Sequence, residues 1–250
     1  MNQSSHSDPS SHTPTHPIHP ALRPEPYFRW RAGEISRLEA FCDVVFGFAI
    51  TLLVVSLEVP RSYAELVADM RGFLPFALCF IQLALIWRTH YKFSRRYGLE
   101  DSYTVFLNVV LLFLVLFFVY PLKFVFTLLF SQLAGGTDIA QGIGPSEGSH
   151  LMQIYAAGFT AVFFLFSLMY AHAYKLRTAL ELNPVEVLET RFAIQENAIM
   201  VIVGVVSFGL AFKNPAWAGW WYFVLGPALG THGAIFGKRV RLAAGKLHLP

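Results

Sequence analysis

The sequence carries little charge for its length. Asp, Glu, Lys and Arg make up 14% of the 250 residues, whereas soluble domains carry about 25%. Hydrophobic residues account for 55% of the chain, and its mean hydropathy is +0.49. This balance excludes an ordinary soluble domain and predicts an all-α integral membrane protein.

Residues that build common catalytic and metal sites are also scarce. The two cysteines, Cys42 and Cys79, lie in apolar runs and form neither a CxxC pair nor a disulfide framework. We interpret them as small buried side chains. The sequence has no HExxH motif and no nucleophile beside a base within its apolar runs. We therefore predict neither an enzyme nor a cofactor, and no nucleic-acid partner.

Residues 1–30 differ from the rest because they contain no apolar run. They are rich in Ser, Pro and His and lack the hydrophobic region of a signal peptide. We predict a disordered cytoplasmic tail. Its histidines, His6, His12, His16 and His19, allow loose metal binding, although a solvated low-complexity tail is the simpler interpretation.

Six apolar segments follow, and a helix needs about 20 apolar residues to cross a bilayer. We expect them near residues 41–59, 72–90, 102–122 (continuing to 130 past Pro121), 151–174, 192–212 and 215–236. The uncharged part of the first, residues 44–57, is short, so this helix must include Asp43 and Glu58 near its ends. We predict a six-helix transmembrane domain over residues 31–240 and a short basic tail over 241–250.

The basic residues fall mainly on one side of these segments. Only four of the 19, Arg61, Arg71, Lys123 and Lys213, fall on the other side. The side richer in Lys and Arg faces the cytoplasm. The pattern predicts an even number of spans, both termini in the cytoplasm and a multi-pass protein of the plasma membrane.

A polar stripe runs along the first apolar segment. Asp43, Gly47 and Thr51 are spaced i, i+4, i+8 and share one helical face, and Glu58 lies close to it. An overlapping arc of about 100° contains Phe48, Thr51, Leu52 and Val55. Small and polar groups can pack helices together in lipid. Alternatively, they line a water-filled path, which Asp43 favours because intramembrane carboxylates face bundle interiors or cavities.

This stretch, RLEAFCDVVFGFAITLLVVSLEVP at residues 37–60, resembles a known signature. Prokaryotic relatives of transmembrane protein 175, a lysosomal potassium channel, carry RxxxFSDxVFAIAITLLVLxIxVP on their first helix, and Arg37, Phe41, Asp43 and Thr51 match at fixed spacing. The stretch WRTHYKF at 87–93 is similar to the family's WxxHHxxF. The third segment, 108–121, matches more loosely, and the resemblance covers residues 34–240.

The resemblance implies a homotetramer of six-span subunits in membrane lipid. The first helix of each subunit would line a central pore that conducts K⁺ passively in preference to Na⁺. The family's pore-lining positions map to Phe48, Thr51, Leu52 and Val55. No TVGYG-like filter loop is present, in agreement with a pore of another kind.

Two positions depart from the family pattern. Cys42 stands where Ser is usual, which weakens one hydrogen bond, and Phe48 stands at the expected hydrophobic gate. Rings of Phe48 and Leu52 would form a constriction that gates by dewetting, and Thr51 hydroxyls would offer oxygen ligands. Glu58 would concentrate cations at the outer mouth, unless it is only a solvated helix end.

Four residues near the cytoplasmic ends of the first two segments would form an inter-helix polar network: Arg37, Asp43, Trp87 and His90. A buried charge in a membrane needs a partner. His90 would also give pH sensitivity if it titrates near neutrality, although an ordinary interfacial histidine is the simpler interpretation.

The alternative function is a proton-coupled secondary transporter with proton sites at Asp43 and Glu196. Such carriers show broken helices at matching positions of two repeats. Pro121 and Gly204 do not occupy matching positions in the two halves of the chain. This mismatch favours the channel.

Overall fold

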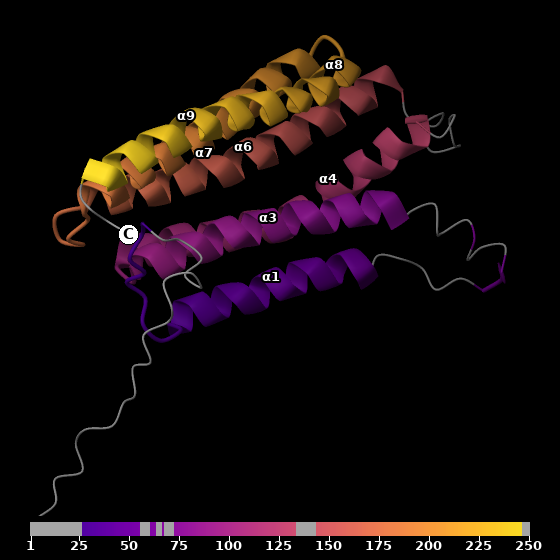
Figure 1. Ribbon diagram of the computed structural model, residues 1–250. Coiled ribbons are helices and arrows are strands. Elements are labelled where there is room, and N and C mark those ends of the chain that lie inside the picture. The colour runs from indigo at the N-terminus through magenta and orange to yellow at the C-terminus, as the bar shows by residue number, and fades with distance from the viewer. Residues whose placement is uncertain (1–26, 56–60, 64–66, 68–72, 134–143, 247–250) are drawn as a thin grey trace, which may run out of the picture.

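The computed structural model describes residues 27–55, 61–63, 67, 73–133 and 144–246, and six long helices dominate this part (Figure 1). They are α1 Arg37–Val55, α3 Phe73–Tyr97, α4 Ser102–Leu133, α6 Pro145–Lys175, α7 Pro184–Ala211 and α9 Leu225–Lys246. Two short pieces precede α9: α8 Pro215–Trp220 and the 3₁₀ helix η2 Trp221–Val224.

The helix ends carry local signals that fix where each helix starts or stops. At α7, the Asn183 side chain accepts hydrogen bonds from the backbone of Val185 and Glu186, and the Glu186 side chain accepts one from Asn183 N. This capping box, with Pro184 in the first turn, begins the helix sharply. At the C-terminal end of α3, the next residue is Gly98, whose φ is 58°. Glycine adopts this left-handed conformation at low cost, so it ends the helix.

Four helices are long and apolar enough to span a membrane within the described residues: 73–97, 102–130, 146–175 and 184–211. The chain is therefore a multi-pass membrane protein. The prediction that the third segment continues past Pro121 is confirmed, because α4 runs to Leu133. Proline removes one hydrogen bond from a helix, and neighbouring groups in a membrane bundle compensate for that loss.

The sixth predicted segment, 215–236, is not one uniform helix. It consists of α8, the 3₁₀ turn η2 and the first half of α9, which continues to Lys246. Asn214 caps α8 by accepting hydrogen bonds from the backbone of Ala216 and Trp217. Asn214 thus fixes the start of α8, which ends after six residues where the 3₁₀ turn begins. Pro227 follows this turn and cannot donate a hydrogen bond to the carbonyl of Phe223 within it.

The helices form two groups that α4 and α6 connect. Helices α1, α3 and α4 contact one another, α7 contacts α6, α8 and α9, and α4 packs on α6. Figure 1 shows α1 and α3 on one side of the bundle and α6, α7 and α9 on the other. Fully buried side chains lie at the contacts within and between the groups, among them Leu83, Leu111, Val115, Val162 and Phe166.

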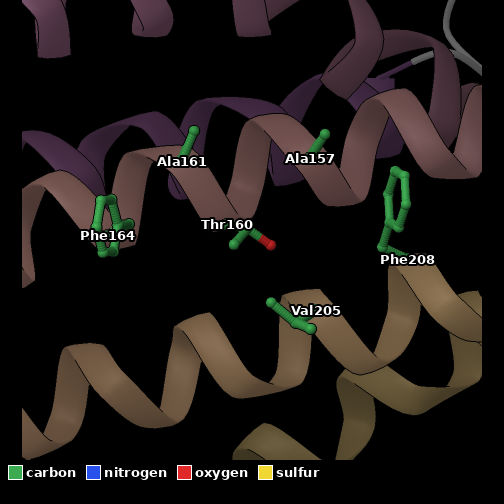
Figure 2. Close-up of a pocket in the computed structure, with 6 residues that line it drawn as sticks. All are labelled: Ala157, Thr160, Ala161, Phe164, Val205 and Phe208. Carbon is green, nitrogen blue, oxygen red and sulfur yellow. The ribbon is translucent and has the colours of Figure 1, made fainter.

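Helices α6 and α7 approach closely at Gly204. A β-carbon at this position would overlap the Thr160 hydroxyl, so only glycine permits the approach. Beside this contact, side chains from both helices line a small apolar cavity of 310 Å³ (Figure 2). Figure 2 shows Thr160 of α6 and Val205 of α7 pointing toward each other across it.

Charged and polar side chains join the helix ends at one end of the bundle. Arg95 at the end of α3 pairs with Glu39 of α1 at 3.7 Å, and Arg96 pairs with Glu189 of α7 at 2.9 Å. His172 near the end of α6 lies 3.1 Å from Asp101, which precedes α4. The starts of α1, α4 and α7 therefore meet the ends of α3 and α6, which gathers their basic residues at one end.

Candidate pore-lining helix

One face of α1 is completely covered by the protein. Cys42, Phe46, Ala49 and Leu53 are each at most 1% exposed, and their spacing of four, three and four residues keeps them on one side of the helix. This side packs against α3 and α4. The contacts fix the rotation of α1 about its own axis and so decide which residues point outward.

The opposite face of α1 has no partner within the described part of the chain. Phe48 is 63% exposed, and Gly47 and Thr51 are exposed beside it. Leu52 is half-buried and packs against the core. The side chain of Val55 and all of Glu58 lie outside the described residues. Of the four predicted pore-lining residues, Phe48 and Thr51 are thus the two that point fully outward.

The hydroxyl of Thr51 has a defined orientation. Its Oγ1 donates a hydrogen bond to the carbonyl oxygen of Gly47 at 2.9 Å. A hydroxyl has one hydrogen and two lone pairs, so the single hydrogen is engaged by the helix itself. The lone pairs remain on an exposed oxygen, which can accept hydrogen bonds or coordinate a cation.

The first turns of α1 are tied to α3 through Asp43. The indole Nε1 of Trp87 donates a hydrogen bond to Asp43 Oδ1 at 2.8 Å. Tyr91, one turn further along α3, stacks on Trp87 with ring centroids 5.7 Å apart. The structure therefore brings together two of the four residues predicted to form an inter-helix polar network.

His90 makes its contact with a different helix. Asn108 of α4 donates from Nδ2 to the Thr104 carbonyl at 2.8 Å, which leaves its Oδ1 facing His90 Nε2 at 2.7 Å. Because an amide oxygen only accepts, Nε2 of His90 carries the hydrogen. The same oxygen lies 3.7 Å from the thiol of Cys42. Asn108 thus joins α1, α3 and α4 at a buried point.

Arg37, the fourth residue of the predicted network, lies apart from the others. It is exposed at the first turn of α1 and makes no ion pair within the described residues. The charged residue of α1 that contacts α3 is instead Glu39. Its carboxylate is 5% exposed and faces Arg95. The distance of 3.7 Å fits an ion pair between a buried acid and a half-buried base.

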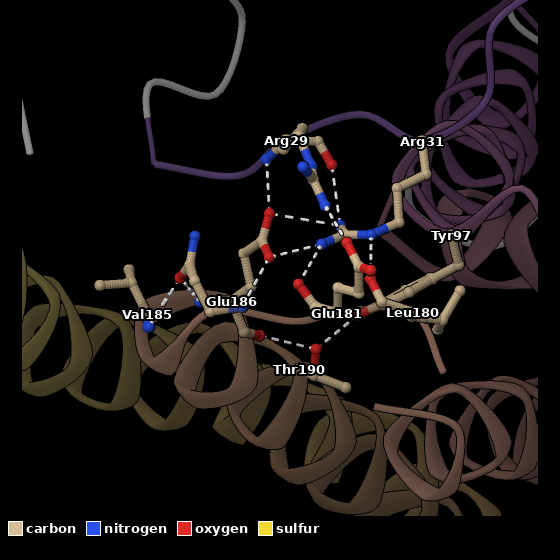
Figure 3. A network of polar contacts seen from close by, with 9 residues as sticks. Arg29, Arg31, Tyr97, Leu180, Glu181, Val185, Glu186 and Thr190 are labelled. Carbon is tan, nitrogen blue, oxygen red and sulfur yellow. Dashed lines mark hydrogen bonds and ion pairs between the residues drawn. The ribbon is translucent and has the colours of Figure 1, made fainter. Parts of the chain in front are cut away.

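The segment just before α1 is fastened to the turn between α6 and α7 (Figure 3). Arg31 lies 2.6 Å from Glu186, and both side chains are nearly buried, at 11% and 1% exposure. Arg31 Nε also donates to the Leu180 carbonyl at 2.7 Å. The backbone N–H of Arg29 donates to Glu186 Oε1 at 2.8 Å. These bonds connect the start of the candidate pore helix to the second group of helices.

The last residues of the predicted tail, 27–30, take part in this attachment. Phe28 is 4% exposed and meets the ring of Tyr97 edge-on, with centroids 5.6 Å apart. The guanidinium carbon of Arg96 lies over the Phe28 ring, 4.5 Å from the ring centroid. Residues 1–26 lie outside the described part of the chain.

Sequence reasoning missed Asn108, Glu39 and the Arg31–Glu186 pair. The signal for Asn108 was present, since an amide inside the uncharged run 102–122 needs a partner in a membrane. Glu186 carried a signal as well, because Asn183 and Glu186 have capping-box spacing. Neither signal names the partner, which depends on how the helices are rotated.

Comparisons with known proteins agree with this architecture. A family model described as endosomal/lysosomal potassium channel TMEM175 matches residues 37–119. Over 234 residues the chain is 38% identical to a protein from Marivirga tractuosa named potassium channel, a match that covers 86% of this chain and 93% of the relative. It is 26% identical over 149 residues to a potassium channel from Chamaesiphon minutus, covering 56% of this chain and 66% of that one.

Two solved structures resemble the chain over most of its length. One is a crystal structure of a variant of the potassium channel MtTMEM175, with a TM-score of 0.76 and 36% identity, covering 86% of this chain and 98% of that one. The other is a lysosomal potassium-selective channel TMEM175 homolog from Chamaesiphon minutus, with a TM-score of 0.55 and 24% identity, covering 82% and 96%. The second likeness concerns the fold alone. Since the first relative is matched over nearly its whole length at 38% identity, the chain belongs to the TMEM175 family.

Proposed function

We propose that four copies of this chain form a potassium-selective channel in the plasma membrane, with α1 of each copy lining a central pore. The channel is a passive conductor of K⁺ and not an enzyme. The named potassium channels among its relatives support the ion. The observation that supports α1 as the lining of the ion pore is its open face. Phe48 and Thr51 point outward there, whereas the opposite face of the helix is fully buried.

A fourfold arrangement gives this open face a partner. In an isolated subunit, the face of α1 that carries Phe48, at 63% exposure, and the exposed Thr51 would contact only lipid. Lipid offers the threonine hydroxyl no hydrogen-bond partner. Around a central axis, four such faces would form rings of Phe48, Thr51 and Leu52 stacked along the pore. The topology assigned to this tetramer has six spans with both termini in the cytoplasm, as the distribution of basic residues favours.

Each ring would have its own task. The aromatic and branched side chains of Phe48, Leu52 and Val55 would narrow the pore and close it by excluding water. Thr51 would supply four oxygens to a partly dehydrated K⁺, and their engaged hydrogens point back at Gly47. Glu58, beyond the described part of α1, would raise the concentration of cations at the outer mouth.

The polar contacts at the start of α1 would hold the pore helix in position. Asp43 accepts from Trp87, and His90 reaches Cys42 through Asn108. We assign these residues to positioning and not to ion contact, because each of them is bonded to a side chain of a neighbouring helix. Arg37 is free of an ion pair within the described chain, and a contact across the subunit interface would give it one.

The experiment is a flux measurement on purified protein in liposomes, with K⁺ on one side and Na⁺ on the other. We expect a current that reverses near the potassium equilibrium potential. Thr51→Ala should move the reversal potential toward zero, since the pore loses its oxygen ligands. Phe48→Ala should raise the current, since the constriction widens.

Thr231→Ala is the matched control. Thr231 is also an exposed helical threonine, and it donates to the carbonyl four residues earlier, at Pro227, at 2.8 Å. It lies on α9, away from α1, so its loss should leave the reversal potential unchanged. Slow saturable uptake that requires a proton gradient and Asp43 would instead indicate the proton-coupled carrier and contradict the channel.

A further inference from the structure

A long groove separates the two groups of helices. It has a volume of 1410 Å³ and is lined by α3 and α4 on one side and by α6, α7 and α9 on the other. Cavities for small molecules are typically about 300–1,000 Å³. This groove is larger and runs along the helices, which suits an elongated occupant with apolar chains.

The wall that α3 contributes changes character along its length. Its first half presents Ile81 and Leu85, which are 51% and 55% exposed. Its second half presents Arg88, Lys92 and Arg96, spaced four residues apart on the same side of the helix. The basic half lies at the end of the bundle where the charged helix ends meet.

The acidic residues facing this end do not cancel its positive charge. Glu189 and Glu196 of α7 are the acidic residues that line the groove. Glu189 pairs with Arg96 at 2.9 Å, with both side chains about nine-tenths buried. The three basic residues of α3 outnumber these two acidic residues, so this end of the groove carries an excess of positive charge. The fourth basic residue of the lining, Lys213, follows the end of α7 and lies at the opposite end of the groove.

The remaining walls are mainly apolar, although Asn197, Lys213 and Asn214 also line them. Phe126 and Leu129 come from the second half of α4, and Met152, Phe159 and Phe163 come from α6. Gln82 of α3 donates a hydrogen bond to the Tyr155 hydroxyl of α6 at 3.4 Å and so links the two walls. Contact between this apolar surface and hydrocarbon chains is more favourable than its contact with water.

We propose that the groove binds an anionic phospholipid, with its phosphate at Arg88 and Lys92 and its acyl chains between α3–α4 and α6. Basic pockets between transmembrane helices on the cytoplasmic side are suited to anionic head groups. The charge gradient along α3 matches such a molecule, with the head at one end and the apolar chains at the other. The lipid would fill the space between the pore helices and the outer helices.

The test is native mass spectrometry of the full-length protein released from nanodiscs of equal phosphatidylglycerol and phosphatidylcholine. We expect phosphatidylglycerol to be retained preferentially. The double variant R88Q/K92Q should lower this preference about 30-fold, the loss expected for two basic residues at a membrane surface. Leu85→Trp should reduce retention of both lipids, because it fills the apolar part of the groove without changing charge.

The double variant K238Q/R239Q is the matched control. It also removes one lysine and one arginine, and both are exposed on α9 outside the groove. Equal losses in the two double variants would overturn the proposal in favour of a general lipid annulus. Cross-linking of Leu85→Cys between subunits without retained phosphatidylglycerol would overturn it in favour of a neighbouring chain. The readout is lipid retention, so it stands apart from whether the protein conducts K⁺.

Discussion

The start of α1 and its second half are held in different ways. At the start, ion pairs and hydrogen bonds reach α1 and the segment before it from α3 and α7, through Glu39, Asp43 and Arg31. In the second half, Phe46, Ala49 and Leu53 hold one face by apolar packing alone, and Phe48 and Thr51 leave the other face open. Directional bonds fix the position of the helix, and packing fixes its rotation.

The largest effect is expected from breaking the attachment before α1. Glu186→Gln removes the counter-ion of Arg31, whose side chain is 11% exposed. Breaking a buried pair costs about 3–5 kcal/mol, and the remaining amide contacts place this variant near the lower value. Thermal unfolding in detergent measures the loss. Glu181→Gln is the control, since its carboxylate is 84% exposed, and an equal loss there would contradict a special role for Glu186.

A pair of phenylalanine substitutions compares the two faces of α1 directly. Phe46→Ala should destabilise the protein by about 3 kcal/mol, because it leaves a cavity against α3 and α4. Phe48→Ala should change the stability of the subunit by less than about 0.5 kcal/mol, because its ring is 63% exposed. Unfolding midpoints of both variants give the comparison. Similar losses would mean that the open face is covered by something that contributes as much as the core.

A smaller effect is expected from the hydrogen bond between α1 and α3. Trp87→Phe keeps the stacking on Tyr91 but removes the donor to Asp43. We expect a loss of about 1 kcal/mol, the usual value for one hydrogen bond, measured by the same unfolding assay. Trp217→Phe removes an indole that is 68% exposed and should have no effect. A Trp87→Phe variant as stable as the parent would show that packing positions α1 at this point too.

The smallest effect concerns the contact between the start of α4 and the end of α6. Burial raises the pKa of the Asp101 carboxyl, but hydrogen bonds from Thr104 and His172 outweigh it, so the pKa lies below its ordinary value. A lowered pKa gives stability above the unfolded value of about 3.9, which is lost as the pH falls through the folded pKa. Asp101 is 40% exposed, so the change should stay below about 1 kcal/mol.

Unfolding midpoints of the parent and of Asp101→Asn between pH 5 and pH 3 (a range of about one unit either side of the reference value) give the test. The parent should lose stability relative to the variant as the pH falls. Parallel curves would show that this contact does not contribute.

The number and approximate positions of the long helices could be predicted from the sequence, because the thickness of the membrane sets the length of an apolar run that crosses it. Runs such as 102–122 and 192–212 become helices, and continuation past Pro121 was correctly expected. The division of the last segment at Trp221–Val224 was not expected, although Pro227 lies just beyond it. A proline nitrogen cannot donate to the carbonyl four residues earlier, at Phe223, and this interrupts the α-helical hydrogen bonds there. The turn and α8 also pack against α7.

The candidate site was readable only in part. Helical spacing placed Phe48 and Thr51 on one face, and the structure places both outward. The partners of polar groups were harder, because spacing along one helix says nothing about the rotation of the next. His90 therefore meets Asn108 and not Asp43, and Arg37 lies away from both. The pore itself stays a prediction.

The orientation of the Thr51 hydroxyl has a consequence for how a pore of this kind would respond to acid. Its hydrogen is donated to the carbonyl oxygen of Gly47. Each of the four Thr51 hydroxyls in the proposed ring would therefore present the lone pairs of its oxygen toward the pore. A hydroxyl does not titrate in the physiological range, unlike a carboxylate or an imidazole. The preference of that ring for positive ions would therefore persist unchanged from neutral to acidic solutions.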